Sequence, residues 1–180
     1  ADVRAKLEAQ AAERDNNVFT NAVIGKVMEN ATVEIPEAMI ERQIDYNYAI
    51  AEEGMRHSWG ANIGSVLKEH YGVGIYSRAR YMAAAGSDAR MSGCEMPVII
   101  VSGSGNQGIT ASVPVVEYAK ELNVSRDQMV RAVLLSDLLT IHLKTGIGRL
   151  SAYCGAVSAG CSAGAAIAYL HGGGFREIAH

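Results

Sequence analysis

The sequence predicts an all-α fold: a helical domain with one glycine-rich loop preceded by a short extended segment, plus an N-terminal helical arm. Helical segments bounded by capping residues, glycines or prolines account for most of the 180 residues. Only residues 98–101 look like a β-strand, and a single strand cannot form a sheet. Residues 150–170 carry no charge and are rich in alanine and glycine, which is typical of a buried helix.

The N-terminal part, residues 1–46, is predicted to be a charged helical arm. Residues 2–29 form a polar helix with a narrow apolar stripe. Pro36 then opens a second helix, over 37–57, at a position where its missing N–H costs nothing. The first 58 residues carry a net charge of −5, whereas the remainder carries +2. We therefore divide the chain into this arm and a second domain, residues 47–180.

The second domain is predicted to be helical apart from its connecting loops. Ser125 opens one of its helices as an N-cap residue, and the three glycines at 172–174 end the last one. The predicted helices span residues 63–71, 77–90, 109–122, 125–145 and 150–170. A chain of this length with 49% hydrophobic residues can bury a substantial core.

A polar, glycine-rich loop lies between the extended segment and the helix that starts near residue 109. We predict that it binds a small polar ligand, because its three glycines allow positive φ and a close approach of the backbone. The N–H groups at the start of the next helix would face an anion there. The predicted substrate-binding residues of the loop are Ser102, Gly103, Ser104, Gly105, Asn106, Gln107 and Gly108.

The same loop matches the pattern G-x-G-x-x-G of dinucleotide-binding proteins. That fingerprint requires a βαβ unit with an acidic residue after its second strand. The segments that follow this loop are helical, and Asp127 lies in the first turn of a helix, where it complements the helix dipole. The pattern therefore favours another small ligand over a nucleotide.

Several other polar or reactive residues are candidates for the site. Asp88 and Arg90 form a second polar cluster, either as part of the substrate site or as an internal ion pair. His142 lies between apolar residues and is predicted to be a hydrogen-bonded core histidine rather than a general base. Cys154 and Cys161 are two helical turns apart, about 10 Å, which is too far for a disulfide or one mononuclear metal site.

Composition excludes some classes of function. The net charge of −3 without a basic cluster argues against a nucleic-acid surface. The uncharged segment 150–170 has too few large aliphatic side chains for a membrane span. Three cysteines, an odd number, in a chain without export features favour a reducing compartment. We therefore expect a cytoplasmic protein that binds a small molecule, and a homo-oligomer is left open.

Residues 26–41 read Lys-Val-Met-Glu-Asn-Ala-Thr-Val-Glu-Ile-Pro-Glu-Ala-Met-Ile-Glu. With their neighbours, from residue 1 to residue 44, they resemble the C-terminal helical domain of the bacterial chaperone trigger factor. In that family the domain cradles unfolded chains with apolar patches on helical arms. The resemblance implies a chaperone-like arm, joined to an unrelated second domain near residue 46.

Four motifs in the second domain, at residues 49–54, 83–94, 102–108 and 148–156, point to a different family. Together they resemble the L-serine dehydratase alpha-chain-like proteins, which include the L-cysteine desulfidases. The resemblance implies β-elimination from a small L-amino acid: L-cysteine to pyruvate, ammonia and sulfide, or L-serine to pyruvate and ammonia. It also implies that the loop holds the substrate carboxylate and that Cys154 is a ligand of a 4Fe-4S cluster.

The chain departs from that family in two places. The family's downstream cysteine pair and its N-terminal motif Ala-Leu-Gly-Cys-Thr-Glu-Pro are both missing. One family cysteine, Cys154, cannot hold a cluster, so we expect no 4Fe-4S cluster in this chain and a lyase fragment that is inactive alone. The alternative is a chaperone-like or structural helical protein without catalytic activity.

Overall fold

The structure is a computed structural model that describes residue 6, residues 35–148 and residues 153–179. The chain divides into two compact units, Ala1–Ile35 and Pro36–His180. Apart from Lys6, the helix predicted over 2–29 lies outside the described residues.

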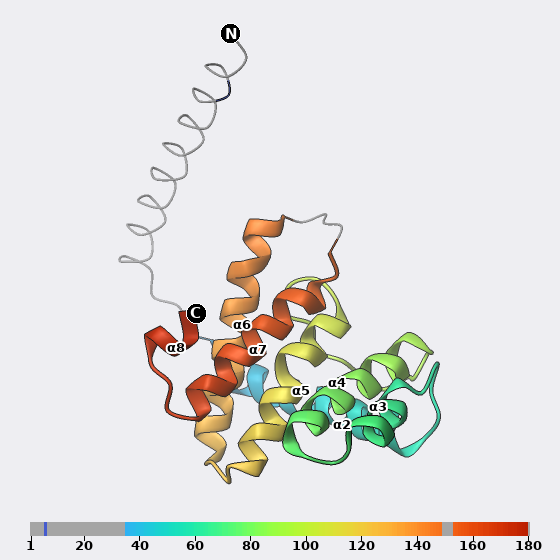
Figure 1. Cartoon of the computed structure of the whole chain (residues 1–180). Helices are drawn as coiled ribbons and strands as arrows, with labels where there is room; N and C mark the ends of the chain where they lie inside the picture. Colours follow the sequence, from blue (N-terminus) through green and yellow to red (C-terminus); the bar gives the residue numbers. More distant parts are fainter. Residues whose placement is uncertain (1–5, 7–34, 149–152, 180) are drawn as a thin grey trace. The chain divides into compact units, whose positions relative to one another are not determined.

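The second unit is all-α, as predicted, and the described residues contain no β-strand. Its helices are α2 (Glu37–Arg56), α3 (Ile63–Tyr71), α4 (Ile75–Met91), α5 (Gly105–Glu121), α6 (Arg126–Ile147), α7 (Gly155–Leu170) and α8 (Phe175–Ala179). Figure 1 shows α5 at the centre of this unit, where it packs against α2, α4, α6 and α7.

Local sequence signals set most of the helix ends. Helix α2 follows Pro36, and α3 has the bounds predicted for it. Helix α6 follows Ser125, whose side chain accepts a hydrogen bond from the Gln128 N–H in a capping box. Helices α3 and α6 end at Gly72 and Gly148, which both have positive φ.

The apolar core consists of two clusters that α5 connects. Val115 and Val116 of α5 belong to a cluster with residues of α2, α6 and α7. Ile109 and Val113, earlier in the same helix, belong to a second cluster with residues of α2 and α4. Because α5 contributes to both clusters, its N-terminal end is held in a fixed place. No helix within the described ranges is both long and apolar enough to cross a bilayer.

The extended segment, predicted over residues 98–101, is held by a side chain instead of a neighbouring strand. The buried Asn47 side chain donates a hydrogen bond to the Ile99 carbonyl at 3.0 Å and accepts one from the Ile99 N–H at 2.8 Å. A third hydrogen bond, at 3.2 Å, joins the Asn47 amide to the Ser112 hydroxyl of α5. One amide thereby satisfies both backbone groups of Ile99 and fixes the chain that leads into the loop.

Candidate functional site

An open cleft of about 680 Å³ lies where the N-terminal ends of α5 and α7 meet the C-terminal part of α6. It brings the predicted glycine-rich loop together with Cys154, the predicted metal ligand, which lies far from the loop in the sequence. The residues that line it are Ser102, Gly103, Ser104, Ile141, Lys144, Thr145, Gly148, Tyr153, Cys154 and Gly155.

The loop at this cleft is shorter than predicted, because α5 begins at Gly105 rather than near residue 109. Ser104 is the N-cap residue, and its hydroxyl accepts a hydrogen bond from the Gln107 N–H at 3.2 Å. The spacing of Ser104 and Gln107 is a capping signal that our sequence analysis missed. Residues 102–104 remain as the loop, and all three line the cleft.

The prediction that the loop glycines take positive φ is wrong. Within the described residues, Gly103, Gly105 and Gly108 are not among the glycines with positive φ. Gly108 is required by packing instead, since a Cβ there would overlap the Ile99 carbonyl oxygen. A Cβ at Gly105 would overlap the side chain of Arg90. These two glycines therefore allow close packing around the start of α5.

Gln107, predicted to bind substrate, is fully buried and connects the two sides of the cleft. Its Oε1 accepts a hydrogen bond from the Ser102 N–H at 3.0 Å. A Cβ added at Gly155 would lie 3.2 Å from the Gln107 side chain, so this amide packs against the first residue of α7. Gln107 thus positions Ser102 and the start of α7 and is not itself part of the cleft lining.

Two helix N-termini converge on the cleft. The first N–H groups of an α-helix have no carbonyl partner within their own helix. In α5 these belong to Gly105 and Asn106, and in α7 to Gly155 and Ala156. The helix dipoles place partial positive charge at the same ends, and Lys144 also lines the cleft. The arrangement favours a small anion such as a carboxylate.

Asp88 and Arg90 are not part of the cleft lining. Asp88 accepts a hydrogen bond from the Ile63 N–H at 2.8 Å, at the start of α3. The Arg90 guanidinium donates one to the Asn106 side-chain oxygen at 3.1 Å, in the first turn of α5. Among the ion pairs of the described residues, none joins Asp88 to Arg90, so the internal pair that the sequence left open is not formed.

The three free cysteines occupy three different environments. Cys154 is exposed, is the N-cap residue of α7 and lines the cleft. Cys94 is partly buried against the second apolar cluster. Cys161 is exposed on α7. His142 is also exposed, and the prediction of a core histidine is therefore wrong.

A 4Fe-4S cluster held by three thiolates does not fit the residues that the structure describes. Cys154 is the one cysteine in the lining of the cleft. Over residues 35–148 and 153–179, no three His, Cys, Asp or Glu side chains are grouped so that they could hold a metal ion. This part of the chain therefore offers one thiolate to such a group, and the expectation about the cluster stays a prediction.

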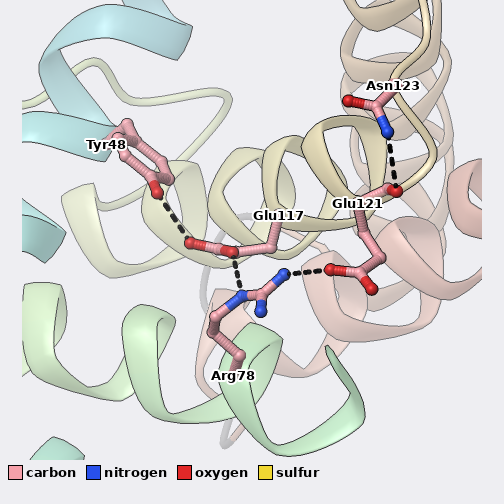
Figure 2. A network of polar contacts seen from close by, with 5 residues as sticks. All are labelled: Tyr48, Arg78, Glu117, Glu121 and Asn123. Atoms are coloured by element: carbon pink, nitrogen blue, oxygen red, sulfur yellow. Dashed lines mark hydrogen bonds and ion pairs between the residues drawn. The ribbon is translucent and has the colours of Figure 1, made fainter. Parts of the chain in front are cut away.

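A second polar cluster, missed by the sequence analysis, lies on α2, α4 and α5 and shares no residue with the cleft lining. Figure 2 shows Arg78 between two carboxylates: it donates to Glu117 at 2.7 Å and to Glu121 at 2.7 Å. The Tyr48 hydroxyl donates to the other Glu117 oxygen at 2.8 Å, and the Lys120 ammonium lies 3.3 Å from the centre of the Tyr48 ring. We call these five residues the Glu117 network.

Within the Glu117 network the charged groups satisfy one another. The Glu117 side chain is 4% exposed, and it receives both a phenol and a guanidinium hydrogen bond. Burial, together with the hydrogen bond to Glu117, raises the pKa of the Tyr48 hydroxyl, which stays a proton donor. Burial lowers the pKa of Lys120. The available sequence signal was one glutamate, Glu117, directly after the apolar pair Val115-Val116.

Comparison with known proteins identifies one family over nearly the whole chain. The family model of the serine dehydratase alpha chain matches residues 5–180. No solved structure matches the chain. Because the match begins at residue 5, it includes most of the predicted N-terminal arm, and the resemblance of that arm to trigger factor is not supported. No comparison tests the division at residue 46, which stays a prediction.

Curated relatives carry the family name UPF0597. One from Desulfitobacterium hafniense is 55% identical over 166 residues, which are 92% of this chain and 39% of the relative. One from Lachnoclostridium phytofermentans is 51% identical over 164 residues, 91% of this chain and 39% of the relative. One from Fusobacterium nucleatum is 43% identical over 169 residues, 91% of this chain and 40% of the relative. The chain thus spans about two fifths of the length of the relatives it matches.

Proposed function

The chain belongs to the serine dehydratase alpha chain family, and on this premise we propose that it carries the carboxylate-binding part of a lyase site for a small L-amino acid. The reaction is β-elimination followed by hydrolysis of the resulting enamine or imine. L-cysteine and water give pyruvate, ammonia and sulfide, whereas L-serine gives pyruvate and ammonia with no net change in water. The free thiols of the three cysteines support a reducing, cytoplasmic location.

The observation that carries the proposal is the convergence of the α5 and α7 N-termini on one cleft with Ser102 and Ser104. A bound carboxylate accepts hydrogen bonds from the first N–H groups of the two helices. The Lys144 ammonium adds positive charge at the same cleft. The Ser102 hydroxyl also lines it and is hydrogen-bonded to the Gln107 side chain. A carboxylate held at several points also fixes the orientation of the Cα–H bond that elimination must break.

The roles of the remaining residues follow from their contacts. Gln107 and Asn47 hold the loop and the segment before it, so that Ser102 keeps its place without a ligand. Ile141 and Tyr153 form apolar walls of the cleft. Cys154 is the candidate for contact with the β-substituent, since it is the exposed thiol in the lining. We expect this chain alone to bind the amino acid without turning it over.

Calorimetric titration of the chain with L-serine and L-cysteine tests the proposal. Both amino acids should bind, and their methyl esters, which lack the carboxylate charge, should bind at least about 10-fold more weakly. Replacing Ser102 by alanine removes a hydroxyl that lines the cleft and is hydrogen-bonded to Gln107, and it should weaken binding of the free amino acids by about 1 kcal/mol. Absence of binding heat in a chain shown to be folded by circular dichroism would contradict the proposal.

A further inference from the structure

Helix α7 is apolar on all of its sides, although one side is exposed. None of its 16 residues is charged. Its inner side packs in the first apolar cluster through Ala163 and Ala166, whereas Val157, Gly160 and Gly164 are exposed. A helix that is apolar all round belongs inside a larger protein core or in a membrane, and α7 does not qualify as a membrane span.

The exposed side of α7 forms one wall of a groove of about 420 Å³, whose other walls are α4 and α5. Each helix contributes residues one turn apart, such as Arg80 and Ala84 of α4 and Thr110 and Pro114 of α5. Among the residues that the structure describes, a Cβ added at Gly160 of α7 would meet no atom within 4 Å, and the same holds for Gly164. The groove therefore has unfilled space directly above a backbone without side chains.

We propose that this groove, between α4, α5 and α7, is the docking site of an amphipathic helix from the part of the family's proteins that this chain does not cover. The groove has the form that accepts an amphipathic helix, with an apolar floor and small residues that allow close approach of two helix backbones. The occupant is available within the family, because about three fifths of the Desulfitobacterium hafniense relative lies outside the matched region. This inference does not depend on amino-acid binding at the cleft.

A charged residue at the groove also indicates what kind of helix would fit there. Arg80 is the one charged residue in the groove lining. Its guanidinium lies 4.9 Å from the centre of the Tyr76 ring, and no carboxylate among the described residues pairs with it. An acidic residue at the edge of the docked helix would complete this contact. The occupant should therefore have an apolar face flanked by Asp or Glu.

The test compares one substitution in two proteins: the 180-residue chain, and a full-length chimera in which the unmatched part of the Desulfitobacterium hafniense relative is joined to it. In the chain alone, Gly160→Leu should leave Tm unchanged or raise it, since the side chain enters open space and leucine is the better helix former. In the chimera the same leucine occupies the space of the docked helix, and Tm should fall by about 5 °C. Gly160→Ala is the matched control and should have a smaller effect in the chimera.

Thiol labelling gives a second readout that does not require a destabilised variant. Gly160→Cys, with the three native cysteines replaced by serine or alanine, should react with a maleimide rapidly in the chain alone and at least about 10-fold more slowly in the chimera. Equal labelling rates, or an equal rise of Tm with Gly160→Leu in both proteins, would overturn the proposal. Protection of Gly160→Cys in the chain alone that increases with protein concentration would assign the groove to a second copy and would also overturn it.

Discussion

The cleft and the Glu117 network are both polar clusters on α5, but they differ in how their hydrogen-bonding groups are used. In the Glu117 network each buried charge has a partner from another helix, as Arg78 and Tyr48 show around Glu117. At the cleft, the first N–H groups of α5 and α7 have no partner in their own helices. The network closes the packing of α2, α4 and α5, whereas the cleft keeps donors available for a ligand.

Helix α5 therefore contributes to one polar cluster that stabilises the fold and to another whose donors can bind a ligand. Buried charges that are paired hold a fold together only while every partner is present. Donors at a helix N-terminus can be satisfied by water or by an anion, so they leave the fold intact in either state. We therefore expect substitutions in the Glu117 network to lower the free energy of unfolding and those at the cleft mainly to lower affinity.

The largest effect is expected from Glu117→Ala. It leaves the Arg78 guanidinium and the Tyr48 hydroxyl without their shared acceptor and should lower the free energy of unfolding by about 3–5 kcal/mol. Chemical denaturation measures it. Glu121→Ala is the control, since that carboxylate is half exposed and its loss should cost less than about 1 kcal/mol. If Glu117→Ala and Glu121→Ala lowered the free energy of unfolding equally, the buried pair of Arg78 and Glu117 would not be the one that stabilises the fold.

Gly108→Ala should have the next largest effect, because its Cβ would overlap the Ile99 carbonyl oxygen, a backbone atom that cannot rotate away. We expect a loss of about 2–3 kcal/mol in the free energy of unfolding. The glycine supports the cleft from behind, so affinity for L-serine should fall as well. Gly146→Ala is the control, since a Cβ there meets no atom of the described residues within 4 Å. If Gly108→Ala left the free energy of unfolding unchanged, this would show that the segment 97–101 shifts freely to make room for the Cβ.

A second buried carboxylate, Asp137, sharpens the comparison because its partner is neutral. The Gln43 amide donates to it at 2.8 Å, and burial raises the pKa of Asp137 to about 7. Between pH 4 and pH 7 the unfolded chain loses this proton and the folded chain keeps it, so stability falls as pH rises through that window. Asp137→Asn should remove this slope, with no change at pH 4 and a gain at pH 8 of at most about 4 kcal/mol, the equivalent of a shift of about three pKa units.

Denaturation of wild type and Asp137→Asn at the two pH values gives the difference directly. A variant that is less stable than wild type at both values would mean that Asp137 is ionised and stabilised in the fold, as Glu117 is.

The smallest effect on the fold is expected from Ser104→Ala, which removes the N-cap of α5. The free energy of unfolding should fall by about 1 kcal/mol, and affinity for L-serine should fall by more than the stability loss explains, since the serine lines the cleft. Ser125→Ala, at the N-cap of α6, is the matched control: it should lose similar stability and keep its affinity. If Ser104→Ala and Ser125→Ala had equal affinity for L-serine, the ligand would have to bind away from the loop.

The fold could largely be predicted from the sequence, because helix signals are local. Pro36, Ser125 and Gly72 lie within a few residues of the ends they set. The site was predicted only in part. Ser102 and Cys154 were found through motifs, but the contacts of Asn47 with Ile99 and of Arg78 with Glu117 join residues 52 and 39 positions apart. Such pairings depend on packing, which neither spacing nor periodicity encodes.

The most direct test of the contrast between the two regions is a ¹⁵N–¹H titration of the labelled chain with L-serine. We predict that the amide signals of Gly105 and Asn106 in α5 and of Gly155 in α7 shift in a saturable way, because their N–H groups bind the carboxylate. The amide signals of Arg78 and Glu117 should stay in place, and ethanolamine, which lacks the carboxylate, should shift none of them. Unchanged signals at the two helix N-termini, or equal shifts in the Glu117 network, would contradict the account.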